Sequence, residues 1–383
     1  MSPLRPLSSS APPDASLTGL YSIQAGRPFA SDLASGLIQM MPDKKLFASA
    51  HILVPSHRAV QALSAAFLEV ADGQPLMLPA ITALGDVDEF LPDILGAQGY
   101  DLPPAMDRVE RHLILAHLIQ GMMIGGRAIS PPQALSLSIS LCALLDQVSQ
   151  SGGSPDGLAD IMPDDFADHW ADIRKFLDII FEQWPDIAAQ KHVMDSGQRS
   201  ALLLSAQCDD WQQNPPAHPV IIAGSTGSLS STRALMKTVM GLPQGFIVLP
   251  GLPEILFGPD DYTAIRADIG HPFHQLLETL AALDVMQDDV KGWVFQPDSQ
   301  MSQTESHLAQ RRALFMEVFR PAEQSYLWRR LAETHRHITR DALASMRRID
   351  AVDMYQEADI IACLMRKTLE HPTKTATLVT ADR

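Results

Sequence analysis

The sequence predicts an α/β fold: a parallel β-sheet interrupted by a long helical insertion. Short apolar runs alternate with amphipathic helices near the start of the chain, and a second β-α-β pattern occupies residues 218–251. Between these two stretches, residues 103–213 have helical periodicity almost throughout. Right-handed crossovers join the strands of such β-α-β units, so both groups are expected to share one sheet.

The first β-α-β unit begins with "GLYSIQ" (19–24), a short strand candidate. It continues into "PFASDLASGLIQMM", whose apolar side chains have helical spacing after Pro28, a residue suited to a first helical turn. "AHILVPS" (50–56) is a continuous apolar run, as expected for a buried parallel strand. A helix follows it, and "LPAITALGDVDEFL" then predicts a third short strand and a turn.

The second unit consists of "HPVIIAGST" (218–226), the helix "SSTRALMKTVMGL" and "GFIVLPG" (245–251). At the end of the chain we expect a strand, a helix beginning near Tyr355 and a last strand, "ATLVTA". A parallel α/β domain does not finish on a buried strand, so the 383 residues are predicted to be the N-terminal fragment of a longer protein.

These patterns predict five regions. They are a disordered tail over 1–16, an α/β domain over 17–102 and 214–260, a helical insertion over 103–213, a helical, Arg-rich region over 261–344, and the start of a second α/β domain over 345–383.

Composition excludes several classes of protein. The chain is 46% hydrophobic and 19% charged, as in globular proteins. It has no secretory signal and no apolar run long enough to cross a membrane, and its three cysteines are far apart, so a reduced cytoplasmic protein is expected. A net charge of −16 argues against a free-standing binder of duplex DNA.

The charge is uneven along the chain. Residues 156–186 hold nine acidic side chains against Arg174 and Lys175, and residues 305–348 hold nine arginines against five acids. We interpret both stretches as solvated helix faces.

The first strand-to-helix loop has the frame of a phosphate-binding P-loop without its chemistry. Aligning Gly26 with the first glycine of G-x-x-x-x-G-K-[ST] places Ser31 on the second glycine, Asp32 on the lysine and Leu33 on the metal-binding hydroxyl. Asp32 would repel a triphosphate and Leu33 cannot bind Mg²⁺. The loop is therefore expected to be a plain turn, with weak phosphate binding by helix amides as the alternative.

No acidic metal ligand follows the later strand "VIIA", where "GSTGS" stands instead. This turn could form an anion-binding nest of amides, but Ser225 or Ser228 is expected to cap the next helix.

Other clusters of polar residues favour structural roles. His271 with His274, and His335 with His337, lack further ligands at zinc spacing, so no metal is predicted. The acidic turn Asp86, Asp88 and Glu89 is interpreted as a helix start rather than as paired catalytic carboxylates.

Taken in order, several segments resemble AddB, the second subunit of the AddAB helicase–nuclease of bacterial double-strand-break repair, and most closely its alphaproteobacterial branch. The similar segments are "IQAGRPFASDLASGL", "HILVPSHRAVQALSAAFLE", "LMLPAITALGDVDEF", "HPVIIAGSTGSLSSTRALMKTVMGLPQGFIVLPGL", "HPFHQLLETLAALDV" and "EADIIACLMRKTLEHPTKTATLVTADR".

The resemblance implies a RecA-like, superfamily-1 helicase-like domain that has lost its ATPase motifs, followed by the start of a second such domain. Ser56, His57 and Arg58 would touch the backbone of single-stranded DNA, although a polar strand end that caps a helix remains the favoured explanation of these three residues. Glu357 with Ala358 would open the second domain, and Arg383 would stand where active helicases carry an ATP-facing arginine.

The resemblance also implies an AddA-type motor subunit as partner. The nuclease domain, its metal ion and the iron–sulfur cluster of the family lie downstream of residue 383, so no activity and no cofactor are expected in these residues. Two alternatives stay open: a nucleotide-dependent enzyme with an atypical P-loop, and an α/β scaffold without a nucleic-acid role.

Overall fold

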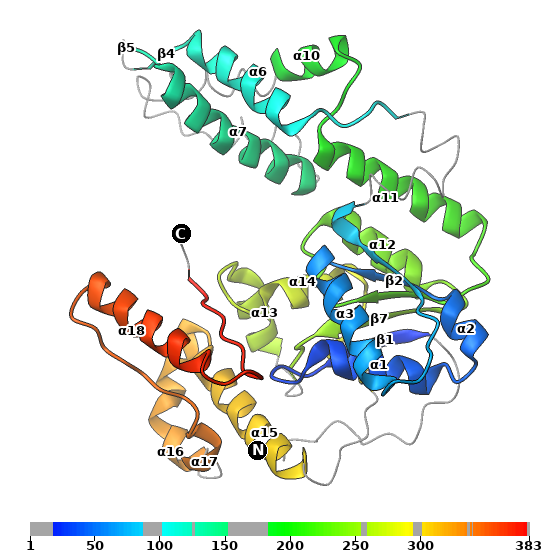
Figure 1. Cartoon of the computed structure of the whole chain (residues 1–383), viewed down its shortest axis with the longest axis vertical. Coiled ribbons are helices and arrows are strands. Elements are labelled where there is room, and N and C mark those ends of the chain that lie inside the picture. The colour runs from blue at the N-terminus through cyan, green and yellow to red at the C-terminus, as the bar shows by residue number, and fades with distance from the viewer. Residues whose placement is uncertain are drawn as a thin grey trace. The chain divides into compact units, whose positions relative to one another are not determined.

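The computed structural model divides into two compact units (Figure 1). Unit 1 comprises residues 1–297 and 319–325, and unit 2 comprises residues 298–318 and 326–383. The structure describes residues 18–86, 102–124, 127–151, 183–253, 259–293, 301–334, 338 and 340–380. The predicted tail over 1–16 lies outside these residues.

Unit 1 is built on a six-stranded sheet in which all strands are parallel, in the order β3-β2-β6-β7-β1-β8. The strands are β1 (Gly19–Ile23), β2 (His51–Val54), β3 (Ala80–Ala83), β6 (Val220–Ala223), β7 (Gly245–Pro250) and β8 (Lys291–Gly292). The prediction of one parallel α/β sheet from two separate groups of strands is therefore confirmed.

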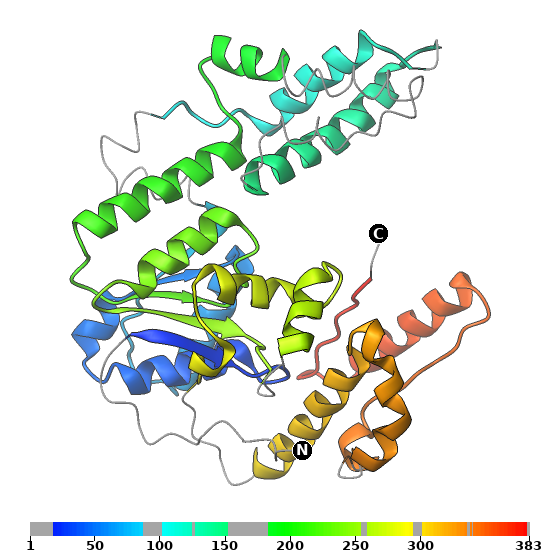
Figure 2. The same cartoon turned by 180° about the vertical axis from the view of Figure 1, so that it is seen from behind.

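Apolar side chains on both faces of the sheet hold it between two layers of helices (Figures 1 and 2). One layer contains α1 (Phe29–Met40), α2 (Lys44–Ser49) and α3 (His57–Val70), and the other contains α11 (Ser196–Gln213), α12 (Ser230–Met240) and α14 (His274–Ala282). Strand β6 shows why: Val220 and Ile222 join the core on one face while Ile221 and Ala223 join the core on the other. Such strands need continuous apolar sequence, which is what made them predictable.

The helical stretch between β3 and β6 has a core of its own. Its elements are α6 (Arg108–Gln120), the antiparallel pair β4 (Met123–Ile124) and β5 (Arg127–Ala128), α7 (Pro131–Ser151) and α10 (Trp184–Gln190). Leu115, Ile119, Leu141 and Trp184 are buried together there. The chain then returns to the sheet through α11, which packs on α12.

Unit 1 continues through α13 (Pro259–Ala267) and the 3-10 turn η3 (Gln287–Asp289). The remaining helices are α15 (Met301–Val318), the 3-10 helix η4 (Ala322–Arg330), α16 (Leu331–Thr334), α17 (Arg340–Leu343) and α18 (Met354–Thr368). Helix α18 begins within one residue of the predicted start at Tyr355.

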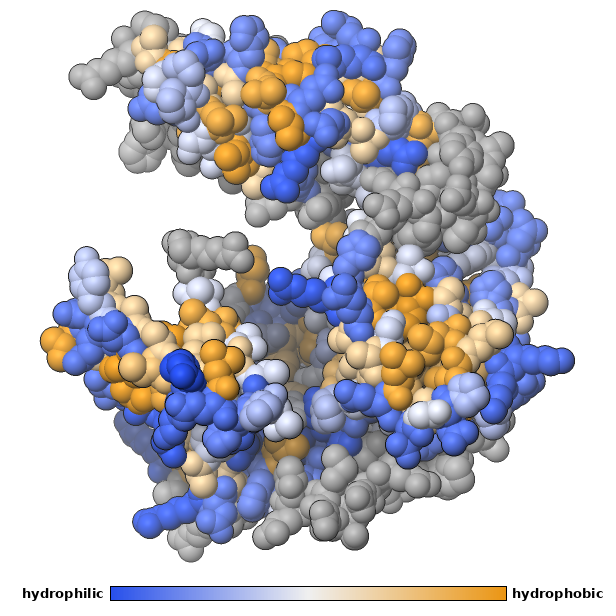
Figure 3. Space-filling model, viewed as in Figure 1, coloured by the Kyte–Doolittle hydropathy of each residue, from blue (hydrophilic) through white to orange (hydrophobic). Residues whose placement is uncertain are grey.

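The strands predicted on either side of α18 are not formed. The described part of unit 2 contains no strand, and residues 374–380 are exposed. A parallel strand needs a neighbour to complete its hydrogen bonds, and the described part of unit 2 offers none. Apolar side chains consequently remain at the surface along α18 and at its C-cap (Figure 3), among them Met354 in the helix and Leu369 at the cap, with 74% and 72% exposure.

His51 opens β2 and is held as a neutral ring inside the fold. Its Nε2 lies 2.8 Å from Oγ1 of Thr82 on the neighbouring strand β3. Burial, followed by the nearby His218, lowers the pKa of His51 from 6.5 to about 4. The unfolded chain therefore binds a proton at this position at a higher pH than the folded protein does.

We predict that stability falls as the pH drops from about 6.5 towards 4, with His51 contributing a loss of about 2.5 kcal/mol at about pH 4.5. His51→Gln keeps a polar group near Thr82 and removes the titration, so its urea-unfolding free energy should fall less over this range. His57→Gln, which removes an exposed imidazole, is the matched control. An identical pH profile for His51→Gln and the parent protein would contradict the prediction.

Candidate functional site

Polar residues gather where the strands of unit 1 end at their carboxyl edge. The loops after β1, β2, β3 and β6 all start at this edge because the strands are parallel. Open parallel α/β sheets bind their ligands here.

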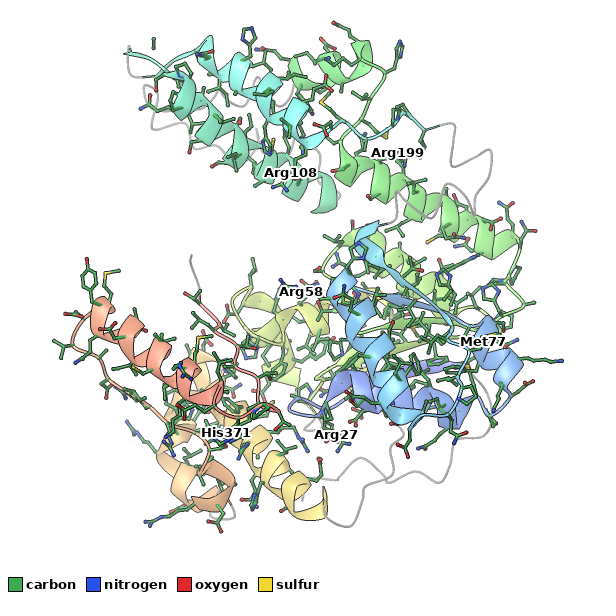
Figure 4. All side chains as sticks on the ribbon, viewed as in Figure 1. Arg27, Arg58, Met77, Arg108, Arg199 and His371 are labelled. Atoms are coloured by element: carbon green, nitrogen blue, oxygen red, sulfur yellow. The ribbon has the colours of Figure 1, made fainter. Side chains whose placement is uncertain are left out.

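The β1–α1 loop is closed by an ion pair between two of its own side chains. Gly26 turns the chain with φ +85°, and the guanidinium of Arg27 then donates to both carboxylate oxygens of Asp32, with Nη2 3.1 Å from Oδ1. The two side chains are only 3% and 10% exposed. Figure 4 shows Arg27 at this loop. The carboxylate at the lysine position is thus neutralised within the protein.

The sequence analysis missed this pair and attributed the loss of phosphate binding to a bare charge on Asp32. The pair joins residues i and i+5 across a loop, a spacing that no periodic pattern reveals. The one signal that could have suggested the pair is an arginine that directly follows the loop glycine, with an aspartate in the first turn of the next helix.

The rest of the loop is packed into the protein. Leu33 is 1% exposed in the core, which excludes it as a ligand. The carbonyl of Asp32 accepts a hydrogen bond from Nε1 of Trp293 at 2.8 Å, and that indole lies so close to Gly36 that an added Cβ would be 2.3 Å from Nε1. Ser31 is half-buried, and its carbonyl accepts from the Ser35 hydroxyl. Helix α1 is therefore fixed against the edge of the sheet.

The β2–α3 junction places Ser56, His57 and Arg58 at the same edge. Ser56 is the N-cap of α3, and its Oγ accepts from the backbone N–H of Ala59 at 3.4 Å. This geometry supports the structural interpretation of Ser56. His57 and Arg58 are the first two residues of α3, and both side chains are exposed (Figure 4 labels Arg58). Arg58 can therefore meet an anionic ligand.

The β6–α12 turn is shaped by Gly224 and Gly227, with φ values of +75° and +66°. The Ser225 hydroxyl accepts from the N–H of Gly227 at 3.2 Å. From α14, Thr279 donates to the carbonyl of Thr226 at 2.6 Å, and a Cβ on Gly227 would lie 2.6 Å from the Thr279 hydroxyl. Thr279 of α14 therefore holds the turn in one conformation.

The prediction that Ser225 or Ser228 caps the following helix was wrong. Helix α12 starts at Ser230, and its N-cap residue is Leu229, whose side chain makes no capping hydrogen bond. The reason is local: the Ser225 hydroxyl is already used within the turn.

A cleft of about 300 Å³ opens at this edge, between the strand ends and the beginnings of α11 and α12. Pro55, Leu84 and Ser225 border it from the strand ends, while α11 contributes Ser196 and Ser200. Among the described residues that line it, none is charged and six carry hydroxyls: Ser196, Ser200, Ser225, Ser228, Ser231 and Thr232. The sequence analysis did not foresee that α11 takes part.

Asp195, directly before α11, fixes the helix beside the cleft. Its carboxylate lies 2.9 Å from Nε of Arg111 and accepts from Nε1 of Trp184, also at 2.9 Å. Arg111 also pairs with Asp146 at 2.6 Å, and Arg199 of α11 donates to the carbonyl of Pro103. The buried side chains of Arg111, Asp195 and Arg199 thus hold the first turn of α11 against the helical stretch.

One pair in this helical stretch has the residue types of a catalytic dyad. Sγ of Cys142 lies 3.2 Å from Nδ1 of His112. Cys142 is only 4% exposed, and burial raises its pKa, so the thiol keeps its proton and is shielded from substrates. The pair is therefore part of the core.

The structure brings together no metal site among the residues it describes: no group of three His, Cys, Asp or Glu side chains could hold an ion. His271 instead places Nε2 2.6 Å from the carbonyl of Phe319. Glu357 is exposed in the first turn of α18. Asp88, Glu89, His335, His337 and Arg383 lie outside the described residues, as does most of the acidic stretch 156–186.

Neither the models of known protein families nor the curated proteins contain a match to this chain. Within the described residues, no helix is both long and apolar enough to cross a membrane.

The Arg27–Asp32 pair generates a stability prediction. Asp32→Leu or Arg27→Met alone leaves one buried charge without its partner and should lower the unfolding free energy by about 3 kcal/mol or more. The double variant Arg27→Met, Asp32→Leu removes both charges and should recover most of that loss. Urea denaturation of the four proteins measures this coupling.

The exposed pair Arg348–Asp350 provides the control, because Asp350→Leu breaks an ion pair that water already screens. Additive losses from the two single changes at Arg27 and Asp32 would show that the side chains are not coupled.

Proposed function

We propose that this chain is the non-catalytic, helicase-like region of an AddB-type subunit of a DNA-repair helicase–nuclease. In this role it binds single-stranded DNA and docks on an AddA-type motor subunit. The observation that carries the proposal is the β1–α1 loop, which has the frame of a nucleotide site closed by Arg27 and Asp32. The strand order, with β7 between β1 and β6, is consistent with a RecA-like sheet.

Two features argue against a working nucleotide site. The only cation placed by this loop, Arg27, already bonds to Asp32 and is 3% exposed, so it cannot reach outer phosphates as a P-loop lysine does. Strand β6 ends at Ala223 and is followed by Gly224 and Ser225, so no carboxylate stands there to ligate Mg²⁺.

The cleft suits an extended phosphodiester chain better than a triphosphate. Hydroxyls such as Ser228 and Ser231 supply neutral donors for phosphate oxygens. Arg58 stands three residues beyond Pro55, which lines the cleft, and adds one positive charge. Because unit 1 is strongly acidic, we expect modest affinity and a contribution of positive charge from the partner subunit.

The first prediction is that the chain does not bind a Mg²⁺–ATP analogue, and that Asp32→Lys does not restore binding. The new lysine would lie beside Arg27, so two cations would repel each other in a buried loop. Isothermal titration calorimetry measures this directly. Micromolar binding by the parent protein would favour the alternative of a nucleotide-dependent enzyme.

The second prediction is that Arg58→Ala weakens binding of single-stranded DNA for all base sequences alike and lowers the salt dependence, as the slope of log K against log salt, by about 0.7. Fluorescence anisotropy would be measured with the chain alone and with the AddA-type partner.

Lys45→Ala, which removes an exposed cation from α2, is the matched control for Arg58. If Arg58→Ala changes neither the affinity for single-stranded DNA nor the salt slope relative to the parent protein, the scaffold alternative gains support.

A further inference from the structure

Unit 2 differs from the rest of the chain in its charge. It contains twelve of the 29 Lys and Arg side chains but only eleven of the 45 Asp and Glu side chains. Unit 2 is therefore close to neutral, while the negative charge of the protein is concentrated in unit 1. Within the Arg-rich stretch, residues 311–348 hold nine arginines and four acids, so this is the most basic part of the sequence.

The 3-10 helix η4 carries exposed aromatic rings in the middle of this basic stretch. None of its residues is buried, and Tyr326 and Trp328 are 64% and 48% exposed. Arg329 and Arg330 follow directly and are exposed as well. Two exposed rings and two exposed arginines therefore lie within five consecutive residues, where a ligand could cover apolar surface and meet positive charge together.

Trp328 is fixed in place although it is half exposed. Its Nε1–H donates to the carbonyl of Glu317 at 2.8 Å, near the end of α15. This bond uses the polar edge of the indole and orients the ring without covering it. Because side chains three residues apart lie on the same side of a 3-10 helix, Tyr326 and Arg329 stand next to each other.

We propose that Tyr326 and Trp328 stack on the bases of single-stranded nucleic acid while Arg329 and Arg330 contact its phosphates. Aromatic rings and arginines together are the means by which proteins bind single strands without reading their sequence. The choice of single-stranded DNA as the natural ligand rests on the proposed function, while the site itself rests on the exposure and charge of η4.

The surroundings of the site favour a polyanion over a protein partner. Tyr355 is the contrasting case in the same unit: it is 78% exposed, but its neighbours Asp353, Glu357 and Asp359 would repel phosphates. Around η4 arginines outnumber acids by more than two to one, so binding a nucleic acid relieves repulsion there.

The test uses the full chain and a fluorescent oligothymidylate of about 16 nucleotides. Tyr326→Ala with Trp328→Ala should weaken binding by about tenfold or more, because stacking on each ring is lost. Trp328→Phe in the parent background should retain most of the affinity, since a stacking ring remains. Arg329→Gln and Arg330→Gln should each lower the salt slope by about 0.7.

Tyr355→Ala and Arg366→Gln are matched controls, since they remove an exposed ring and an exposed arginine from α18. Circular dichroism of each variant verifies that unit 2 is folded.

Full affinity of the Tyr326→Ala, Trp328→Ala protein, with binding still sensitive to Arg58→Ala, would overturn this proposal and leave the proposed function standing. If the Tyr326→Ala, Trp328→Ala protein no longer bound the motor subunit but kept its affinity for oligothymidylate, η4 would be a protein interface. That result would also overturn the proposal. A parent chain that binds no oligothymidylate would contradict both proposals.

Discussion

The buried ion pair between Arg27 and Asp32 is the constraint on which the candidate site depends. Each charge would be costly inside the protein without the other, since its lost hydration has no compensation. The two-point contact supplies that compensation and ties the start of α1 to the loop after β1. A loop that in a nucleotide-binding protein wraps around phosphates is here filled by its own side chains.

Other contacts follow from this closed loop. With the loop folded on itself, Trp293 can pack on Gly36 and donate to the carbonyl of Asp32. Tyr21 and Phe246 complete an aromatic cluster around that indole, with ring centroids 5.4 and 6.2 Å from it. The edge strand β8, only two residues long, is held beside β1 next to this cluster. The hydroxyl-lined cleft lies at the other end of this edge, beside β2 and β3.

The central strands could be predicted from the sequence because they are buried on both faces. Such strands require short, mostly apolar runs, and "HILV" and "VIIA" are runs of this kind. Strand β8 and the β4–β5 pair were missed because two residues carry no period. The strands around α18 were predicted from the local sequence pattern, which cannot tell whether a neighbouring strand exists. The Arg27–Asp32 pair and the position of α11 beside the cleft depend on contacts between side chains. The periodicity of the sequence does not reveal such contacts.

The cleft illustrates this limit most clearly, because its walls come from distant parts of the chain. Ser56 and Arg58, next to the lining residue Pro55, were singled out only because the segment "HILVPSHR" resembles one that touches single-stranded DNA in the AddB family. Ser196 and Ser200 lie some 140 residues later, on a helix whose position is set by the bonds of Asp195 to Arg111 and Trp184. The helical stretch therefore does more than interrupt the sheet. By fixing the first turn of α11, it supplies one wall of the cleft, and a change that frees Asp195 would alter the cleft without touching any residue that lines it.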